Sequence, residues 1–266
     1  MARIKSGDAE LHYEVVGHGP AIVLLHPFPA CHQFWLPAAQ ALSTHYRLIL
    51  PDLRGHGDSS VGEGPATMEK HAADIFRICD QEGLGRAAFA GVSIGGYAMF
   101  EFWRRYRDRV RVLALCNTRP QAETAESRAA RLKTAADVLE HGTEPFIDSM
   151  VPKLFGKTTI ATRPDLVEAA KRMMRKMSPN AVNLVQRGMA DRVDSLPTLK
   201  TINVPTLIVG ASEDVASPLA DAELMRQNIP GADLKVIPRA GHYAIFEQPQ
   251  EAGAVLRQFF DTAYKP

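Results

Sequence analysis

The chain of 266 residues is 45% hydrophobic, which is enough to bury a substantial core in one α/β domain that carries an insertion. Its 31 basic and 30 acidic residues leave a net charge near +1, so nothing favours nucleic acid or an anionic membrane as a partner. The three cysteines are widely spaced and match neither a disulfide framework nor a zinc site. With no apolar leader at its start and no apolar run of about 18 residues, the sequence predicts a cytoplasmic protein.

The first 116 residues alternate between strand and helix patterns. Residues 2–16 predict an opening antiparallel hairpin around a turn at Gly7. Apolar runs that predict buried strands lie at residues 21–25, 46–50, 87–92 and 110–116. Helical patterns lie at residues 34–43, 68–82 and 97–106. This alternation implies a parallel sheet with helices on both faces.

The pattern changes after Asn117. Residues 120–200 hold no convincing strand and are interrupted by prolines, which predicts several helices inserted between two strands. Inserts of this size at the carboxyl edge of a sheet usually carry function, so a lid is expected. We interpret each methionine of the insert first as core, with an adaptable acyl pocket as the alternative for some of Met150, Met173, Met174, Met177 and Met189. Beyond the insert, strands are expected at residues 204–210 and 234–237, and helices at 221–228 and 249–262.

The stretch Gly91-Val92-Ser93-Ile94-Gly95-Gly96 joins a predicted strand to a predicted helix, with a serine at the turn. Such a turn strains the serine backbone and exposes its hydroxyl above the sheet. Gly91 and Gly95 are needed because a Cβ would clash where the strand and the helix pass close to the turn. The motif indicates the nucleophile of a serine hydrolase.

Two further polar residues, Asp214 and His242, lie just past the carboxyl ends of predicted strands. That edge of a parallel sheet is where ligands bind, and serine, acid, histidine is the chain order expected there. We expect His242 to take the proton of the Ser93 hydroxyl and Asp214 to orient the imidazole. Glu213 is the alternative acid. His26 is a rival base, although it precedes the serine and better fits a brace for its own loop.

The loop His26-Pro27-Phe28-Pro29 follows a predicted strand. Phe28 keeps its N–H between two prolines that have none, so the N–H groups of Phe28 and Ile94 are the expected donors to an oxyanion. The alternative for this loop is a rigid connection and nothing more. The polar run Asp52–Asp58 is interpreted as a tight turn held by side chain–backbone hydrogen bonds and an Arg–Asp pair, in preference to a metal or catalytic cluster.

Together these stretches resemble the α/β-hydrolase fold family, from the opening hairpin to the last helix. The resemblance implies a mostly parallel eight-stranded sheet with helices on both faces. It also implies a core of residues 1–118 and 201–266 and a helical cap at 119–200, inserted after strand six. Pro27 departs from the family pattern, in which glycine is commoner.

The segment Asn117-Thr118-Arg119 looks like that of 3-oxoadipate enol-lactonases and small bacterial carboxylesterases. Haloalkane dehalogenases and epoxide hydrolases are similar overall but place aspartate at the elbow, and Ser93 argues against both. By this resemblance Ser93 is the nucleophile, Asp214 the acid and His242 the base, with Phe28 and Ile94 as oxyanion donors.

The sequence therefore predicts a hydrolase that needs no cofactor or metal and cleaves small carboxylic esters through an acyl-enzyme on Ser93. An enol-lactonase is the first alternative, followed by a C–C hydrolase or perhydrolase on the same triad. The non-enzyme alternative is a ligand-sensing protein with slow hydrolysis. The expected partner is a small-molecule ester or lactone, with neither nucleic acid nor membrane, and a homo-oligomer is left open.

The expected pocket residues are Trp35, Asn117, Arg119, Met150 and Tyr243. If the substrate is an anionic lactone, a cationic residue should enter the pocket, with Arg119, Arg128 and Arg131 as the candidates.

Overall fold

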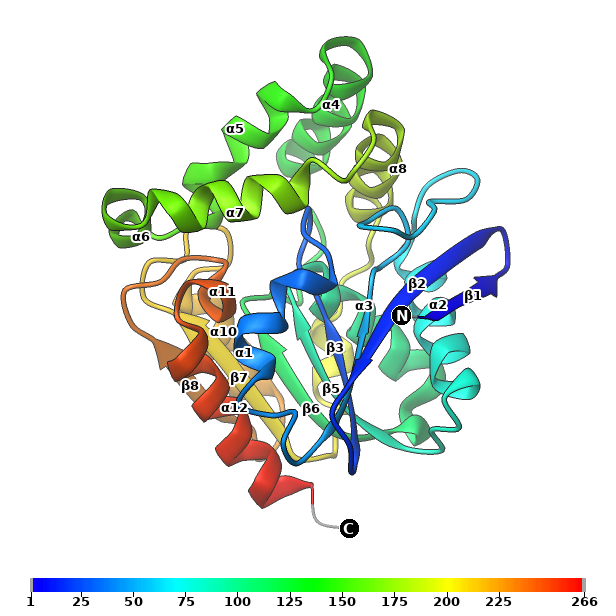
Figure 1. Ribbon diagram of the computed structural model, residues 1–266, viewed down its shortest axis with the longest axis vertical. Coiled ribbons are helices and arrows are strands. Elements are labelled where there is room, and N and C mark those ends of the chain that lie inside the picture. Colours follow the sequence, from blue (N-terminus) through cyan, green and yellow to red (C-terminus); the bar gives the residue numbers. More distant parts are fainter. Residues whose placement is uncertain (1, 265–266) are drawn as a thin grey trace.

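The computed structural model describes residues 2–264, which form one central sheet with helices on both faces (Figure 1). The strands are β1 Ala2–Ser6, β2 Ala9–Val16, β3 Ala21–Leu25, β4 Arg47–Pro51, β5 Ala87–Val92, β6 Val110–Cys116, β7 Thr206–Ala211 and β8 Asp233–Ile237. They lie in the order β1-β2-β4-β3-β5-β6-β7-β8. Within residues 2–264, the pairs β1–β2 and β2–β4 are antiparallel and the other pairs are parallel. The predicted mostly parallel, eight-stranded sheet is confirmed.

The central strands are buried on both faces. Every residue of β3, β5 and β7 is buried. Parallel strands sandwiched between helices read as continuous apolar runs, because neither face meets water, and these runs are the ones that the sequence shows. The carboxyl ends of β5, β6, β7 and β8 consequently meet at one edge, where the loops after them carry the candidate residues.

The helices of the core are α1 Leu36–Ala39, α2 Met68–Gln81, α3 Ile94–Tyr106, α10 Leu219–Asn228, α11 Ala244–Glu247 and α12 Pro249–Ala263. On one face of the sheet α1 packs against α12, and on the other α2 packs against α3 (Figure 1). The start of α2 is fixed by Thr67, whose side chain accepts a hydrogen bond from the Lys70 N–H.

The helix expected at residues 34–43 is much shorter than predicted. A 3-10 turn at His32–Phe34 precedes α1, which has four residues. Pro37 is tolerated because it stands in the first turn, where its missing N–H has no partner to lose. After Ala39 the chain closes i→i+3 bonds, from Ala41 N–H to the Ala38 carbonyl and from Leu42 N–H to the Ala39 carbonyl, so the α-helix ends there.

All of residues 119–200 are described, and they contain no strand, as the sequence predicted. Their helices are α4 Ala125–His141, α5 Glu144–Leu154, α6 Lys157–Thr162, α7 Pro164–Met174, α8 Pro179–Ala190 and α9 Leu196–Leu199. We call residues 119–200 the helical insertion. Figure 1 shows α4–α8 as a layer beyond the carboxyl edge of the sheet, and α4 packs against α8.

The prolines of the helical insertion mark where its helices begin. Pro145, Pro164, Pro179 and Pro197 each stand at one of the first two positions of a helix, and only Pro152 lies inside one. A proline at the first turn sacrifices no intrahelical bond, so these residues start helices and stop the preceding segments. Within residues 2–264, no helix is long and apolar enough to cross a membrane.

Candidate active site

Ser93 stands alone at the turn between β5 and α3, with backbone angles φ 53° and ψ −114°. A Cβ on Gly91 would lie 2.6 Å from the Gly95 carbonyl oxygen, and one on Gly95 would lie 2.7 Å from the Leu25 carbonyl oxygen. Both glycines are therefore sterically required. The strained backbone is held by the Ser93 carbonyl, which accepts hydrogen bonds from Thr118 Oγ1 and from the Tyr97 N–H.

His242 and Asp214 form a buried pair beside that turn. The imidazole Nδ1 lies 2.9 Å from Oδ2 and 3.1 Å from Oδ1 of Asp214. Oδ1 also accepts from the N–H groups of Ala216 and Ser217, each at 2.9 Å. Burial raises the pKa of Asp214, but the His242 ring and these hydrogen bonds outweigh burial, so the pKa is lowered overall. The carboxylate is thus ionised and aimed at one nitrogen of the ring, while Ser93 and His242 line the same cavity.

Glu213 and His26, the alternative acid and the alternative base, make hydrogen bonds with other groups. The Glu213 carboxylate accepts from the Thr158 N–H at 2.9 Å and from Thr158 Oγ1 at 2.5 Å, so it faces the helical insertion. His26 is fully buried, with Nδ1 donating to the Pro27 carbonyl and Nε2 accepting from the Leu53 N–H, both at 2.9 Å. Burial lowers the pKa of His26 to about 4, so its ring is neutral and braces its loop.

The two backbone groups expected as oxyanion donors have no partner among residues 2–264. Ile94 is the first residue of α3, where an N–H points out of the helix. The Phe28 N–H likewise makes no hydrogen bond, whereas the Phe28 carbonyl accepts from the Tyr243 hydroxyl at 3.4 Å. The Phe28 ring lines the cavity and packs edge-on against His56, with 5.8 Å between ring centroids. Both N–H groups are free to bind a ligand oxygen.

A cavity of about 370 Å³ lies above Ser93, and most of its wall comes from the helical insertion. Of the expected pocket residues, Arg119 and Met150 line this cavity, and Arg131 lines it as well. Arg128 does not, because it pairs on the surface with Asp191. The lining residues are Phe28, Ser93, Tyr97, Arg119, Glu123, Ser127, Ala130, Arg131, Thr134, Phe146, Ser149, Met150, Lys153, Leu154, Gln186, Met189, Ala216 and His242.

Trp35, Asn117 and Tyr243 lie outside this lining. Trp35 and Tyr243 are fully buried, and both pack edge-on against Phe34. Asn117 instead donates from Nδ2 to Asp214 Oδ2. Sequence reasoning missed Tyr97, although its spacing offered a signal: four residues after Ser93, it lies one helical turn further along the same face.

The loop that carries His242 is hydrogen-bonded to the helical insertion. Glu247, in α11, accepts from the Gly241 N–H at 2.8 Å and from the Gly156 N–H at 3.0 Å. The Tyr243 N–H donates to the Leu154 carbonyl at 2.9 Å. A Cβ on Gly156 would lie 2.8 Å from the Gly241 nitrogen, so the two loops touch along their backbones. Burial raises the pKa of Glu247 overall, despite these donors.

The polar run Asp52–Asp58 serves the turn, as the sequence predicted. The buried Asp52 carboxylate accepts from the N–H and Nδ1 of His32, from Nδ1 of His12 and from the Asp58 N–H, at 2.7–3.0 Å. His12, His32 and Asp52 lie close enough together to hold a metal ion. However, both rings already donate Nδ1–H to the carboxylate, so the cluster fits hydrogen bonding better than metal ligation.

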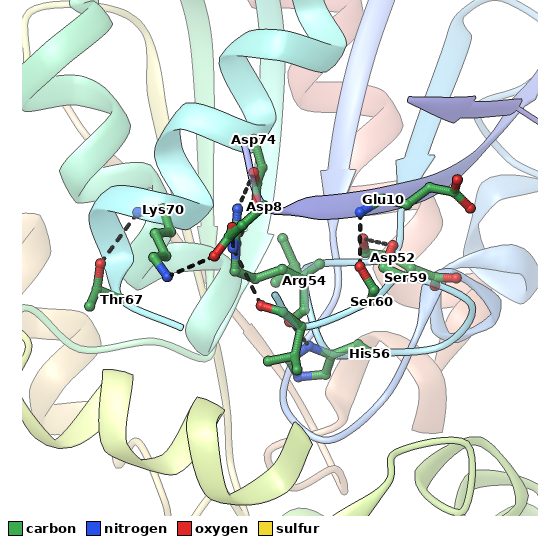
Figure 2. Close-up of polar contacts among 12 residues, drawn as sticks. Asp8, Glu10, Asp52, Arg54, His56, Ser59, Ser60, Thr67, Lys70 and Asp74 are labelled. Atoms are coloured by element: carbon green, nitrogen blue, oxygen red, sulfur yellow. Dashed lines mark hydrogen bonds and ion pairs between the residues drawn. The ribbon is translucent and has the colours of Figure 1, made fainter. Parts of the chain in front are cut away.

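Arg54 provides the arginine–aspartate pair of this turn. Figure 2 shows its side chain between Asp74 and Asp8, which come from α2 and the β1–β2 turn. The guanidinium binds the Asp74 carboxylate at 2.7 and 2.8 Å and Asp8 at 2.8 Å. These contacts tie the turn to its neighbours and leave it outside the cavity.

The fold is that of a known class of protein. A model of the alpha/beta hydrolase fold family matches residues 20–249, and the chain belongs to that family.

Among solved structures, a thermophilic esterase from Thermogutta terrifontis, described with malate bound, is similar over 100% of both chains, with 34% identity and a TM-score of 0.96. The enol-lactonase from Burkholderia xenovorans LB400 is similar over 98% of this chain and 100% of its own, with 26% identity and a TM-score of 0.91. The 3-oxoadipate enol-lactonase 2 of Acinetobacter baylyi is 25% identical over 95% of each chain. These relatives support hydrolysis of a small molecule as the general function.

Proposed function

We propose that the chain is a serine hydrolase that cleaves small carboxylic esters through an acyl-enzyme on Ser93. The observation that carries the proposal is the hydrogen bond between His242 Nδ1 and Asp214, made by a histidine that lines one cavity with Ser93. With Nδ1–H donated to the acid, Nε2 is left as the basic nitrogen. The strained turn at Ser93, a residue that lines the cavity, supports a hydroxyl exposed toward the substrate.

The chemistry follows from these groups in order. Ser93 Oγ attacks the ester carbonyl carbon while His242 Nε2 takes the hydroxyl proton, and the carbonyl oxygen becomes an oxyanion. The free N–H groups of Phe28 and Ile94 bind that oxyanion. The carbon–oxygen bond to the alcohol breaks as His242 protonates the leaving oxygen. A water molecule, deprotonated by His242, then attacks the acyl-enzyme. The bond between the acyl carbon and Ser93 Oγ breaks as His242 returns the proton to Oγ, which releases the carboxylic acid and restores the Ser93 hydroxyl.

The helical insertion serves as the cap of this site in our proposal. Support comes from the cavity wall, to which α4, α5 and α8 contribute Ala130, Met150 and Met189. Thioether side chains adapt to acyl groups of different shape. Shortening Met150 to alanine should shift the preferred acyl chain to longer esters, measured as kcat/KM over a p-nitrophenyl series from acetate to octanoate. An unchanged profile would remove Met150 from the acyl pocket.

A lactone is the second candidate substrate. Opening a lactone breaks the same acyl carbon–oxygen bond, with the alcohol still attached to the acyl group. Two observations favour it: the similarity to enol-lactonases, and Arg119 and Arg131 in the cavity wall. Parallel assays of short p-nitrophenyl esters and of five- and six-membered lactones decide which is preferred.

Substitution of Ser93 by alanine tests the proposal directly. Turnover should fall by at least about a thousandfold, because the covalent step is lost, while circular dichroism stays unchanged. A fluorophosphonate should add covalently to Ser93 in the wild type, as read by peptide mass spectrometry. Retained turnover in Ser93→Ala would overturn the proposal. One equivalent of product followed by negligible turnover would favour a ligand sensor over an enzyme.

A further inference from the structure

The wall of the cavity above Ser93 carries an excess of positive charge. Its lining includes Arg119, Arg131 and Lys153 but only one carboxylate, that of Glu123. The lining thus holds a net charge of about +2 with His242 neutral, whereas the whole chain has a net charge of +1. The charge is therefore concentrated at the candidate site.

Glu123 is the centre of this arrangement. Its side chain is 1% exposed and is bound by Arg119 at 3.2 Å, by Arg131 Nε at 2.7 Å and by Arg192. Among residues 2–264, the further hydrogen bonds of the Arg131 and Arg192 guanidinium groups go to uncharged partners: Gln186 and Met189 for Arg131, and the Gln121 carbonyl for Arg192. One carboxylate hence orients three guanidinium groups. Burial lowers the pKa of Arg192, but the Asp221 charge opposes that shift, so two carboxylates act on these three cations.

The positive charge of these arginines affects the neighbouring Tyr97 phenol. The Arg192 guanidinium lies over the Tyr97 ring, 4.2 Å from its centroid, and Tyr97 lines the cavity. Burial raises the pKa of the Tyr97 phenol, but Arg192, Arg119 and Arg131 lower it overall. Arg119 also keeps a buried Nε with no hydrogen-bond partner among residues 2–264. A buried donor without a partner is costly, and an anion in the cavity would relieve both the charge and the unmet donor.

We propose that Arg119 and Arg131, oriented through Glu123, form together with Lys153 an anion subsite that binds a carboxylate of the substrate. The preferred substrates are then half-esters of short dicarboxylic acids, or lactones with a free carboxylate. The arginine donors suit this group because a guanidinium matches the geometry of a carboxylate. This inference rests on the proposed function, since it assigns the substrate class of the same site.

The experiment compares two esters of equal carbon number that differ in the terminal group, a carboxylate in mono-p-nitrophenyl glutarate and a methyl in p-nitrophenyl pentanoate. In the wild type, kcat/KM should favour the glutarate half-ester. In Arg119→Gln that preference should fall by about 10- to 100-fold, the factor expected for a charge-assisted hydrogen bond. Arg128→Gln, on the same segment but paired with Asp191 at the surface, is the matched control and should keep the wild-type ratio. Equal preference in the wild type and in Arg119→Gln would overturn the proposal.

A binding measurement separates this inference from the proposed chemistry. Calorimetry with Ser93→Ala and free glutarate requires no turnover, and binding should weaken when Arg119→Gln is added. Inorganic phosphate at the same concentration should bind more weakly than glutarate, and the reverse order would contradict a carboxylate subsite. If Ser93→Ala remains active yet binds glutarate, the proposed function fails and the subsite stands. If Ser93→Ala is inactive and does not bind glutarate, the subsite fails alone.

Discussion

Asn117 donates a hydrogen bond from Nδ2 to Oδ2 of Asp214 across 2.9 Å, and thereby joins the ends of two neighbouring strands. Asn117 follows β6 with a left-handed backbone, φ 42°, and its N–H donates to the Val209 carbonyl. Asp214 follows β7 and faces His242 with the same oxygen. The Asp214 carboxylate is consequently oriented by both Asn117 and His242 in the absence of a substrate.

Removal of the Asn117 amide should lower kcat by about tenfold, because the acid then loses one of the bonds that orient it. Asn117→Ala and Asn117→Gly both remove that bond, but only glycine tolerates the left-handed backbone without strain. We expect the same loss of kcat in both and a higher melting temperature for the glycine variant. A loss confined to Asn117→Ala would trace the effect to backbone strain instead of the hydrogen bond.

Asp214→Asn should lower kcat by about 10⁴-fold, since an amide no longer favours the tautomer with its proton on Nδ1 of His242. The matched control is Glu213→Gln, because Glu213 adjoins Asp214 in the chain but bonds to Thr158. That control should stay near the wild-type kcat. Steady-state kinetics on one short ester measures both. A large loss of kcat in Glu213→Gln with a small loss in Asp214→Asn would show that Glu213, and not Asp214, orients His242.

Asp52 should make the fold sensitive to acid. Burial raises the pKa of Asp52, but the hydrogen bonds from His32 and from the Asp58 N–H outweigh it and hold the pKa well below the ordinary value of 3.8. A carboxyl with a lowered folded pKa contributes stability above its ordinary pKa, and this contribution is lost as the pH falls below about 4. Asp52→Asn should cost about 3 kcal/mol at pH 7 and flatten the decline between pH 4 and pH 2. Urea unfolding at several pH values gives both, and an equally steep decline in the variant would contradict the assignment.

Gly156→Ala should impair both stability and turnover, because the added Cβ meets the Glu213 carboxylate at 2.5 Å and the Gly241 nitrogen at 2.8 Å. The displaced backbone lies next to His242. We expect a loss of about 2 kcal/mol in the free energy of unfolding, as for other overpacked sites, together with a lower kcat. Gly85→Ala is the control, since its Cβ would meet nothing within 4 Å. Wild-type kcat in Gly156→Ala would show that the two loops move independently.

The sheet and the order of the candidate residues can be predicted from the sequence because both depend on short stretches of adjacent residues. Strands buried on both faces appear as apolar runs, and Ser93 and Asp214 each follow such a run, whereas His242 follows the largely exposed strand β8. The glycines around Ser93 meet a steric requirement that the motif itself predicts, because a Cβ at Gly91 or Gly95 would clash with nearby backbone.

The cavity wall was harder to foresee because it depends on contacts between distant segments. Trp35 looked suited to a pocket, but the packing of Phe34, Trp35 and Tyr243 buries it completely. Glu123 and Arg192 are 69 residues apart and meet only when α8 folds back on α4. Their pairing leaves no periodic or spacing signal in the chain, unlike the strand runs.

The contact among Gly156, Gly241 and Glu247 bears on how such proteins diversify. Two segments that are remote in the chain, around Gly156 and at residues 241–247, pack closely together, so a change in one is tolerated only with a compatible change in the other. A chimera that exchanged residues 119–200 alone would place a different surface against residues 241–247. Grafts of the helical insertion should therefore include residues 240–247 from the same donor, so that both sides of this contact come from one protein.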